Sequence, residues 1–256
     1  MGNKFDDLAA TIDDAARKGD AIAQLSEASA FTLPQAYDIQ EKSIGLRLAR
    51  GEFRVGMKMG FTSRAKIIQM GVDDMIWGRL TDGMLVEDGG EISFADYVHP
   101  RVEPEVAYLL KEPLEGPVTT IQAMSAVEAM APALEIIDSR YKDFKFTVED
   151  VVADNASSSG FVVGPWCHAE FDHSNLGMIM EFDGRPVQIG STAAILGNPA
   201  RSLAAASRMV AEFGERLEAG WIIMAGGATA AEALRPGVSV RNSVEHLGSV
   251  GFKVSA

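Results

Sequence analysis

The segment that decides the fold is His99-Pro100-Arg101-Val102-Glu103-Pro104-Glu105-Val106-Ala107-Tyr108-Leu109-Leu110. If it is an extended strand, Val102, Val106 and Tyr108 face one side while Glu103 and Glu105 face the other. The two glutamates are then about 6.6–7 Å apart along the backbone, so their carboxylates can converge on one cation. An isolated Glu-x-Glu pair is more often a solvated strand face. Pro104 and the apolar continuation after Glu105 argue against that alternative here.

A third carboxylate is expected from the segment Ala131-Pro132-Ala133-Leu134-Glu135-Ile136-Ile137-Asp138-Ser139-Arg140. Glu135 lies between two apolar residues in a predicted core strand, where a charge is costly without a partner. Asp138 is expected to pair with Arg140 or to cap a turn, and the alternative is the outer shell of a metal. The sequence therefore predicts that a hard divalent cation, Mg²⁺ or Mn²⁺, binds Glu103, Glu105 and Glu135.

Other polar segments offer residues for the same pocket. Lys58 lies in an alternating strand between glycines, which suits proton transfer or anion stabilisation; the alternative is a lysine that reaches solvent from an edge strand. The run Asp154–Gly160 either lines a pocket or forms a turn. The run Ala225–Thr229 either cradles a substrate carboxylate with bare backbone N–H groups or is a tight turn.

Composition narrows the class of protein. The chain has 256 residues, 47% of them hydrophobic, and 36 acidic residues against 23 basic ones give a formal charge of -13. This balance argues against binding to nucleic acid or to an anionic membrane surface. A single cysteine, Cys167, excludes an intrachain disulfide, and no signal peptide or membrane span is evident. We therefore expect a cytoplasmic enzyme with a small-molecule substrate.

The pattern of elements favours an α+β or mostly β fold over a doubly wound sheet, and it divides the chain into two parts. Residues 1–50 are predicted to be helical, as a lid or packing element, and residues 51–256 form the catalytic domain. The predicted strands are 53–61, 101–111, 133–138, 159–164, 177–182, 220–225, 237–245 and 249–254. The predicted helices are 32–50, a short one from Ser63 to about Gly71, 119–130 and 199–218.

Four stretches together resemble the fumarylacetoacetate hydrolase superfamily, and specifically its branch of 2-oxopent-4-enoate hydratases and 4-oxalocrotonate decarboxylases. The likeness covers nearly the whole chain and implies a mixed β-roll or barrel-like sandwich core with an N-terminal helical segment. Within the branch, Trp77–Asp82 and Trp221–Thr229 look more like the decarboxylases. The four matching stretches are Lys58–Ser63, Val102–Glu105, Ala133–Arg140 and Ala153–Ser158.

The resemblance also implies a chemistry. It makes Glu103, Glu105 and Glu135 the metal ligands and Lys58 the active-site lysine. The implied reaction is decarboxylation of 2-oxohex-3-enedioate in the meta-cleavage degradation of aromatic compounds. Alternatives are hydration of 2-hydroxypenta-2,4-dienoate, or a non-catalytic subunit that stabilises a partner hydratase; a complex with that hydratase is also expected. The remaining expected catalytic residues are Asp154, Asn155 and Ser158, and the expected substrate-binding residues are Thr62, Ser63, Gly226, Gly227 and Thr229.

Overall fold

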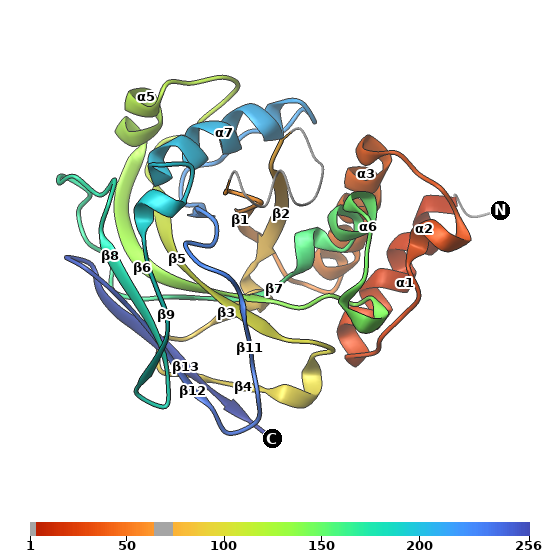
Figure 1. Ribbon diagram of the computed structural model, residues 1–256. Coiled ribbons are helices and arrows are strands. Elements are labelled where there is room, and N and C mark those ends of the chain that lie inside the picture. Colours follow the sequence, from red (N-terminus) through yellow and green to blue (C-terminus); the bar gives the residue numbers. More distant parts are fainter. Residues whose placement is uncertain (1–3, 64–73) are drawn as a thin grey trace.

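The computed structural model describes residues 4–63 and 74–256, and it has an α+β architecture with two sheets and two groups of helices (Figure 1). The larger sheet is curled, and its strand order is β2 (Ile76–Thr81), β1 (Arg54–Gly60), β10 (Ile222–Met224), β5 (Arg101–Leu110), β6 (Val127–Ile137), β7 (Ser158–Val163) and β3 (Leu85–Val86), with β11 (Glu232–Ala233) also on β5. The smaller sheet has the order β4 (Glu91–Ser93), β13 (Gly248–Ser255), β12 (Ser239–Val244), β8 (Gly177–Phe182) and β9 (Arg185–Ser191).

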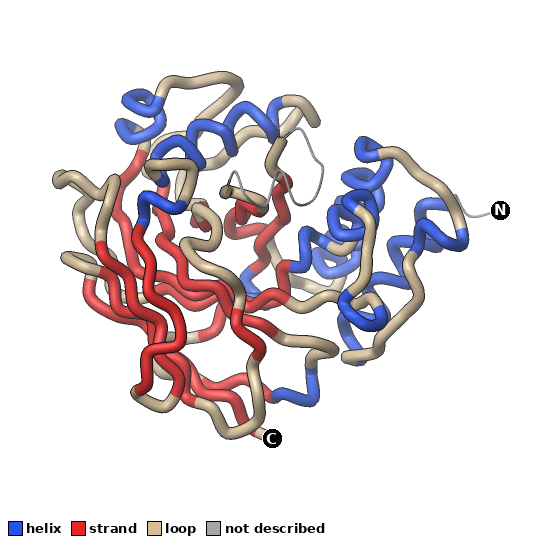
Figure 2. Tube along the Cα trace, viewed as in Figure 1, coloured by secondary structure: helices blue, strands red, loops and turns tan. Residues whose placement is uncertain are grey.

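The helices lie in two places around these sheets. One group forms a lobe at the right of the view, and the other lies along the top (Figure 2). The lobe contains α1 (Lys4–Lys18), α2 (Leu25–Ala28), α3 (Leu33–Ala49) and α6 (Val148–Ala153), and the other group contains α5 (Thr120–Ser125) and α7 (Pro199–Ala211). No helix in the described ranges is both long and apolar enough to cross a membrane.

Helix starts follow the sequence more closely than helix ends. The backbone N–H of Thr32 donates to Oε1 of Gln35 at 2.9 Å, as part of a capping box at the start of α3. Asn198 caps α7 by accepting from the N–H of Ala200 at 2.9 Å. The predicted helix 199–218 is too long, because α7 ends at Ala211.

The predicted helix 119–130 is wrong after Ser125, because β6 begins at Val127 and pairs with β5 along its whole length. The sequence did not predict β2 or β9. The short helix predicted from Ser63 to about Gly71 lies outside the described residues.

The register of β5 brings the acidic residues together. Glu103 lies directly opposite Glu135 in the antiparallel β5–β6 pair. On its other edge, β5 pairs with β11 only at Arg101 and Val102 and with β10 only from Ala107 to Leu109. Pro104, which has no N–H to donate, lies in the gap between these two short strands. The chain between β10 and β11 therefore turns beside the glutamates.

The main hydrophobic core joins the helical lobe to the sheets. It contains Ile12 and Ile39 from the lobe, Met57 and Tyr108 from the larger sheet, and Leu203 from α7, all buried. Because one core spans these elements, the lobe is held against the site-bearing strands by apolar burial.

Candidate metal centre

Three carboxylates meet inside the larger sheet. One oxygen from each of Glu103, Glu105 and Glu135 lies within 4.8 Å of the others. Glu105 and Glu135 are fully buried, and Glu103 is 7% exposed. Carboxylate oxygens in this number and at this spacing are ligands that hard divalent cations prefer.

Lys58 balances part of this charge. Its Nζ lies 3.0 Å from Oε1 of Glu135 and donates a hydrogen bond to Oε2 at 3.1 Å. Three carboxylates and one ammonium leave a net charge of -2 (-3 + 1), which one divalent cation would neutralise. Lys58 is therefore a buried, paired lysine and does not reach solvent from an edge strand.

The electrostatics show a need for positive charge. Burial, followed by the charges of Glu135 and Glu103, raises the pKa of Glu105 well above its usual value. Burial also raises the pKa of Glu135, although Lys58 opposes this shift. Oε1 of Glu105 is buried and has no hydrogen-bond partner among the described residues. A buried carboxylate oxygen without a hydrogen-bond donor needs another partner, and a bound cation would provide one.

A turn between β10 and β11 contacts this cluster. The backbone N–H of Gly226 donates to Oε2 of Glu105 at 2.7 Å. Gly227 lies against Glu103. The Gly226 amide is thus directed to a carboxylate of the cluster, and contact of either glycine with the substrate stays a prediction.

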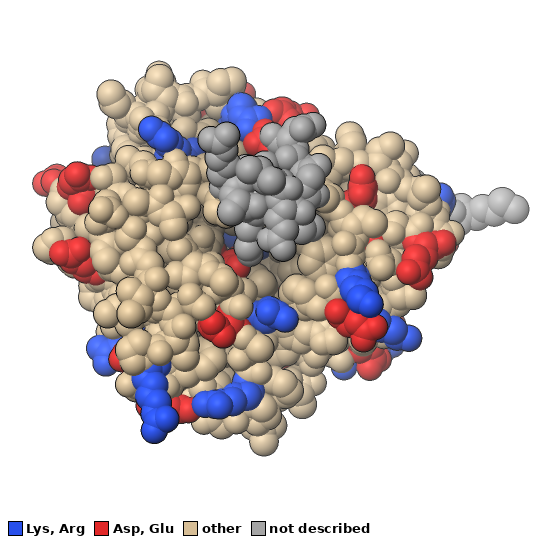
Figure 3. Space-filling view, in the orientation of Figure 1, with Lys and Arg blue, Asp and Glu red and all other residues tan. Residues whose placement is uncertain are grey.

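A cavity of about 310 Å³ opens beside the cluster. This size suits a small organic acid. The cavity brings together Glu103 and four of the expected substrate-binding residues, but its lining does not include Gly226. Lysine and arginine side chains are interspersed with acidic ones across the described part of the face drawn in Figure 3. The cavity is lined by Gly60, Phe61, Thr62, Ser63, Glu103, Ala194, Gly227, Ala228, Thr229 and Ala230.

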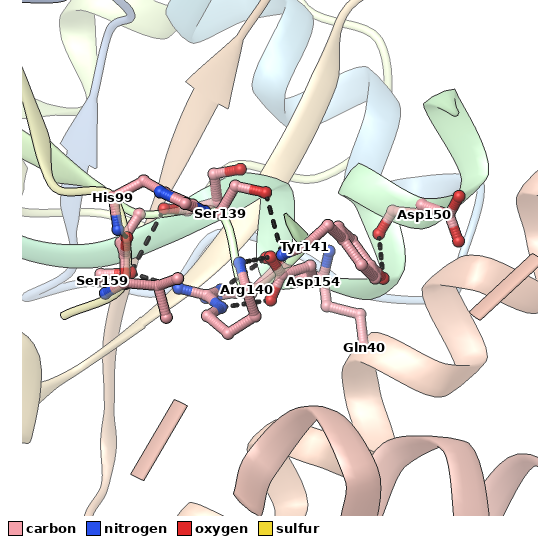
Figure 4. A network of polar contacts seen from close by, with 12 residues as sticks. Gln40, His99, Ser139, Arg140, Tyr141, Asp150, Asp154 and Ser159 are labelled. Atoms are coloured by element: carbon pink, nitrogen blue, oxygen red, sulfur yellow. Dashed lines mark hydrogen bonds and ion pairs between the residues drawn. The ribbon is translucent and has the colours of Figure 1, made fainter. Parts of the chain in front are cut away.

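Asp154 lies in a buried polar network (Figure 4), and neither Asp154 nor Asn155 lines this cavity. Asp154 accepts from the backbone N–H of Arg140 at 3.0 Å and also from its Nε. Burial raises the pKa of Asp154 to about 6, against the opposing effect of Arg140. Asn155 accepts from the backbone N–H of Arg79 at 2.7 Å and donates to the carbonyl of Arg79 at 2.9 Å. Both side chains therefore hold backbone segments together.

Ser158 lies closer to the carboxylates. It follows three residues with left-handed backbone, Asn155, Ala156 and Ser157, whose φ angles are 50°, 52° and 59°. Its hydroxyl favours the charged form of Glu135, yet it makes no hydrogen bond of ordinary geometry within the described residues. Such backbone strain is characteristic of functional sites, because the surrounding contacts must maintain it.

The sequence did not predict the partner of Arg140. Arg140 pairs with Asp154, whereas Asp138 accepts the backbone N–H groups of Val98 and His99 at 2.9 and 2.5 Å. The expected Asp138–Arg140 pair is therefore wrong, because Asp138 instead holds the segment that leads into β5. A place for Asp138 in the outer shell of a metal stays a prediction. Residue spacing could not show which of two acidic neighbours the guanidinium would reach.

Comparisons with known proteins agree with this geometry. A model of the fumarylacetoacetate (FAA) hydrolase C-terminal domain matches residues 74–255. This chain belongs to the fumarylacetoacetate hydrolase family. The family predicted from the four sequence stretches is thus confirmed, together with its fold type.

Within this family, the chain is similar to both enzymes of the predicted branch. It is 60% identical over 98% of its length to a 4-oxalocrotonate decarboxylase from a Pseudomonas species, covering 98% of that protein. It is 38% identical over 77% of its length to a 2-hydroxyhexa-2,4-dienoate hydratase from Comamonas testosteroni, covering 76% of it. Its fold matches the solved structure of 4-oxalocrotonate decarboxylase from Pseudomonas putida G7, complexed with magnesium and adipate, with a TM-score of 0.95, 39% identity, and coverage of 98% of this chain and 97% of that one.

Proposed function

We propose that this chain is a metal-dependent lyase that decarboxylates 4-oxalocrotonate (2-oxohex-3-enedioate) to 2-hydroxypenta-2,4-dienoate and CO₂ in the meta-cleavage degradation of aromatic compounds. The buried group of Glu103, Glu105, Glu135 and Lys58 beside a cavity carries this proposal. The 60% identity to a decarboxylase over nearly the full chain supports the choice of reaction. Adipate, bound in the similar solved structure, is a six-carbon dicarboxylate like the proposed substrate.

In this proposal, Glu103, Glu105 and Glu135 hold Mg²⁺ or Mn²⁺. When bound, the cation supplies Lewis acidity that stabilises negative charge on the C2 oxygen of the substrate. The charge-assisted contact with Lys58 favours the ionised form of Glu135, against the effect of burial, and orients it as a ligand. Gly226 does the same for one oxygen of Glu105.

The reaction breaks the bond between C5 and C6 of the substrate. C6 leaves as CO₂, the bonding electrons form a C4–C5 double bond, and the former C3–C4 π electrons shift to C2–C3, leaving charge on the C2 oxygen. In this proposal, Lys58 stabilises that charge or delivers the proton that neutralises it. Contacts that strengthen as the charge moves toward Lys58 accelerate the reaction.

The other expected site residues have two kinds of role. Thr62, Ser63, Gly227 and Thr229 line the cavity and would contact the substrate. Ser158 would orient the substrate or a water beside Glu135. For Asp154 and Asn155, the contacts with Arg140 and Arg79 support a positioning role over direct catalysis.

The test is a CO₂-release assay on purified, metal-stripped protein supplied with Mg²⁺ or Mn²⁺ and 2-oxohex-3-enedioate. We expect CO₂ release with metal, and a large loss of kcat in Glu103→Gln, because that variant lacks one ligand. Consumption of 2-hydroxypenta-2,4-dienoate without CO₂ release would instead establish the hydratase. No turnover by the chain alone, followed by turnover after a hydratase is added, would support the non-catalytic subunit.

Two expectations stay predictions. Association with a 2-oxopent-4-enoate hydratase would protect an unstable dienol product, and co-purification of the two proteins would test it. A cytoplasmic location is the second expectation, and cell fractionation would test it.

A further inference from the structure

We propose that the turn Ala225–Gly227 sets the size of the cation site, so that the site favours a small octahedral cation over a larger one. This inference rests on the proposed metal site. The turn lies against two of the three carboxylates. Gly226 donates a hydrogen bond to Glu105, and Gly227, which has no side chain, leaves space that Glu103 occupies.

Gly226 fixes Glu105 by a contact that only glycine permits. Its φ is +106°, outside the range that residues with side chains adopt comfortably. A Cβ on Gly226 would lie 2.2 Å from Oγ1 of Thr62, so Thr62 packs directly on the turn. In this conformation the Gly226 N–H points at Glu105 and holds one carboxylate oxygen at 2.7 Å.

Gly227 controls Glu103 by leaving room for it. A Cβ on Gly227 would lie 2.7 Å from Oε2 of Glu103 and 2.9 Å from its Cδ. The backbone of Gly227 is outside the left-handed region, so alanine fits the main chain there. The atoms that an added methyl group would displace belong to the far end of a flexible side chain. Alanine at this position should therefore leave the fold intact and move a metal ligand.

The turn itself is anchored and resists displacement. Its Ala225 N–H donates to the carbonyl of Val106 at 3.0 Å, and the buried hydroxyl of Ser202 on α7 donates to the Ala225 carbonyl at 2.7 Å. Beyond the glycines, the Ala228 N–H donates to the carbonyl of Pro104 at 3.0 Å. The bonds to Pro104 and Val106 hold the turn against β5 on both sides of Glu105, so the Glu103 side chain yields first.

Cations differ in how well they tolerate such a displacement. Mg²⁺ requires nearly ideal octahedral geometry at about 2.0–2.1 Å, whereas Ca²⁺ accepts 6–8 oxygens at about 2.3–2.6 Å in flexible arrangements. A carboxylate pushed out of place should cost Mg²⁺ binding more than Ca²⁺ binding. The ratio of the two affinities therefore reports ligand position, and a general loss of stability would not change it.

The experiment measures Mg²⁺ and Ca²⁺ binding to metal-free protein by calorimetry in wild type, Gly227→Ala and Gly45→Ala. Gly45 is the matched control, because a Cβ there would meet nothing within 4 Å. We expect Gly227→Ala to weaken Mg²⁺ binding about 10–100-fold, the usual effect of disturbing a ligand's support. Ca²⁺ binding should change several-fold less, and Gly45→Ala should match wild type for both ions.

A double-mutant cycle tests the contact itself. In the Gly227→Ala background, Glu103→Asp withdraws the carboxylate from the added methyl group, so it should cost less Mg²⁺ affinity than in wild type. Additive effects, or an unchanged affinity ratio in Gly227→Ala, would overturn the inference. If Gly227→Ala fails to fold, Ser202→Ala replaces it: loosening the turn should lower the Mg²⁺/Ca²⁺ affinity ratio, and an unchanged ratio overturns the inference. If wild type binds neither cation, the proposed metal site itself fails.

Discussion

Glu105 shows at the scale of one residue how a binding site can oppose stability. Its side chain is fully buried, one oxygen accepts from Gly226, and the other has no partner among the described residues. Burial and two acidic neighbours raise its pKa, so its charge is unfavourable until a cation is present. Sites of this kind are retained for function although they lower the stability of the metal-free protein.

Replacing this carboxylate should therefore affect stability and metal binding in opposite directions. In the presence of EDTA, we expect Glu105→Gln to melt above wild type, by about 2–4 °C for each kcal/mol of repulsion and desolvation removed. Adding Mg²⁺ should raise the Tm of wild type much more than that of the variant. Thermal unfolding with EDTA and with excess Mg²⁺ measures both effects, and a lower Tm for the metal-free variant would contradict this account.

Asp154 should make the free energy of unfolding depend on pH. Its pKa is about 6 in the folded chain, against an ordinary value of 3.8. Because the folded state binds this proton more tightly, the contribution of Asp154 to the free energy of unfolding is complete below about pH 3.8 and is lost as pH rises through about 6.

Asp154→Asn should lack this dependence. The variant loses stability overall, because the buried guanidinium of Arg140 loses its partner. The informative quantity is thus the slope of unfolding free energy against pH, obtained from urea titrations between about pH 4 and 7. Parallel slopes for Asp154→Asn and wild type would show that this carboxyl does not titrate as inferred.

At the scale of elements, the sequence predicted the strand that carries the ligands but not everything that surrounds it. Alternation and the cost of a buried charge were sufficient to select Glu103, Glu105 and Glu135. Local pattern failed over Ala126–Met130, where alanine and methionine suit a helix and only pairing with β5 makes a strand. The partner of Arg140 and the hydrogen bond from Gly226 depend on distant segments, so no local signal predicted them.

The two hydrogen bonds from the Asn155 side chain to the backbone of Arg79 join the segment after α6 to β2, and they give a prediction at this scale. Asn155→Ala removes two buried hydrogen bonds to the backbone of Arg79, and should lower the free energy of unfolding by about 2–4 kcal/mol. Because Asn155 holds β2 and lies outside the cavity, Mg²⁺ affinity should fall less than in Glu105→Gln. Urea unfolding and calorimetry measure the two quantities. Abolished turnover in a variant that remains fully folded would favour the direct catalytic role that the sequence suggested.

At the scale of the whole molecule, the helical lobe and the sheets behave as one body. Gln40 of α3 is buried and donates to the carbonyl of Val152 at 2.7 Å, while it accepts from Nη1 of Arg79 at 2.8 Å. Arg50 pairs with Asp13 through two contacts of 2.6 Å. The predicted division into residues 1–50 and 51–256 stays a prediction. Because the two parts share one hydrophobic core, it can be tested by asking whether they unfold together.

We expect a single cooperative unfolding transition for the full chain. The lobe contributes Ile12 and Ile39 to the same core as Met57 and Tyr108, so neither part can lose its packing alone. Scanning calorimetry should give a calorimetric enthalpy equal to the van't Hoff enthalpy. Two resolved transitions, or hydrogen exchange that is much faster throughout α1 and α3 than in β5, would show that the lobe unfolds independently.

The gap along β5 has a consequence for how this chain can vary. The segment from Ala225 to Ala231 leaves the edge of β5 after β10 and returns to the same edge at β11. The register of both flanking strands against β5 therefore fixes the length of this segment. A residue inserted or deleted there would shift β11 by one position and exchange its inward and outward side chains. The hairpin between β8 and β9, by contrast, lies at the edge of the smaller sheet, where β8 is the strand that pairs with β9. Length changes should therefore accumulate in that hairpin and be rejected beside the glutamates, whatever the composition of the loop.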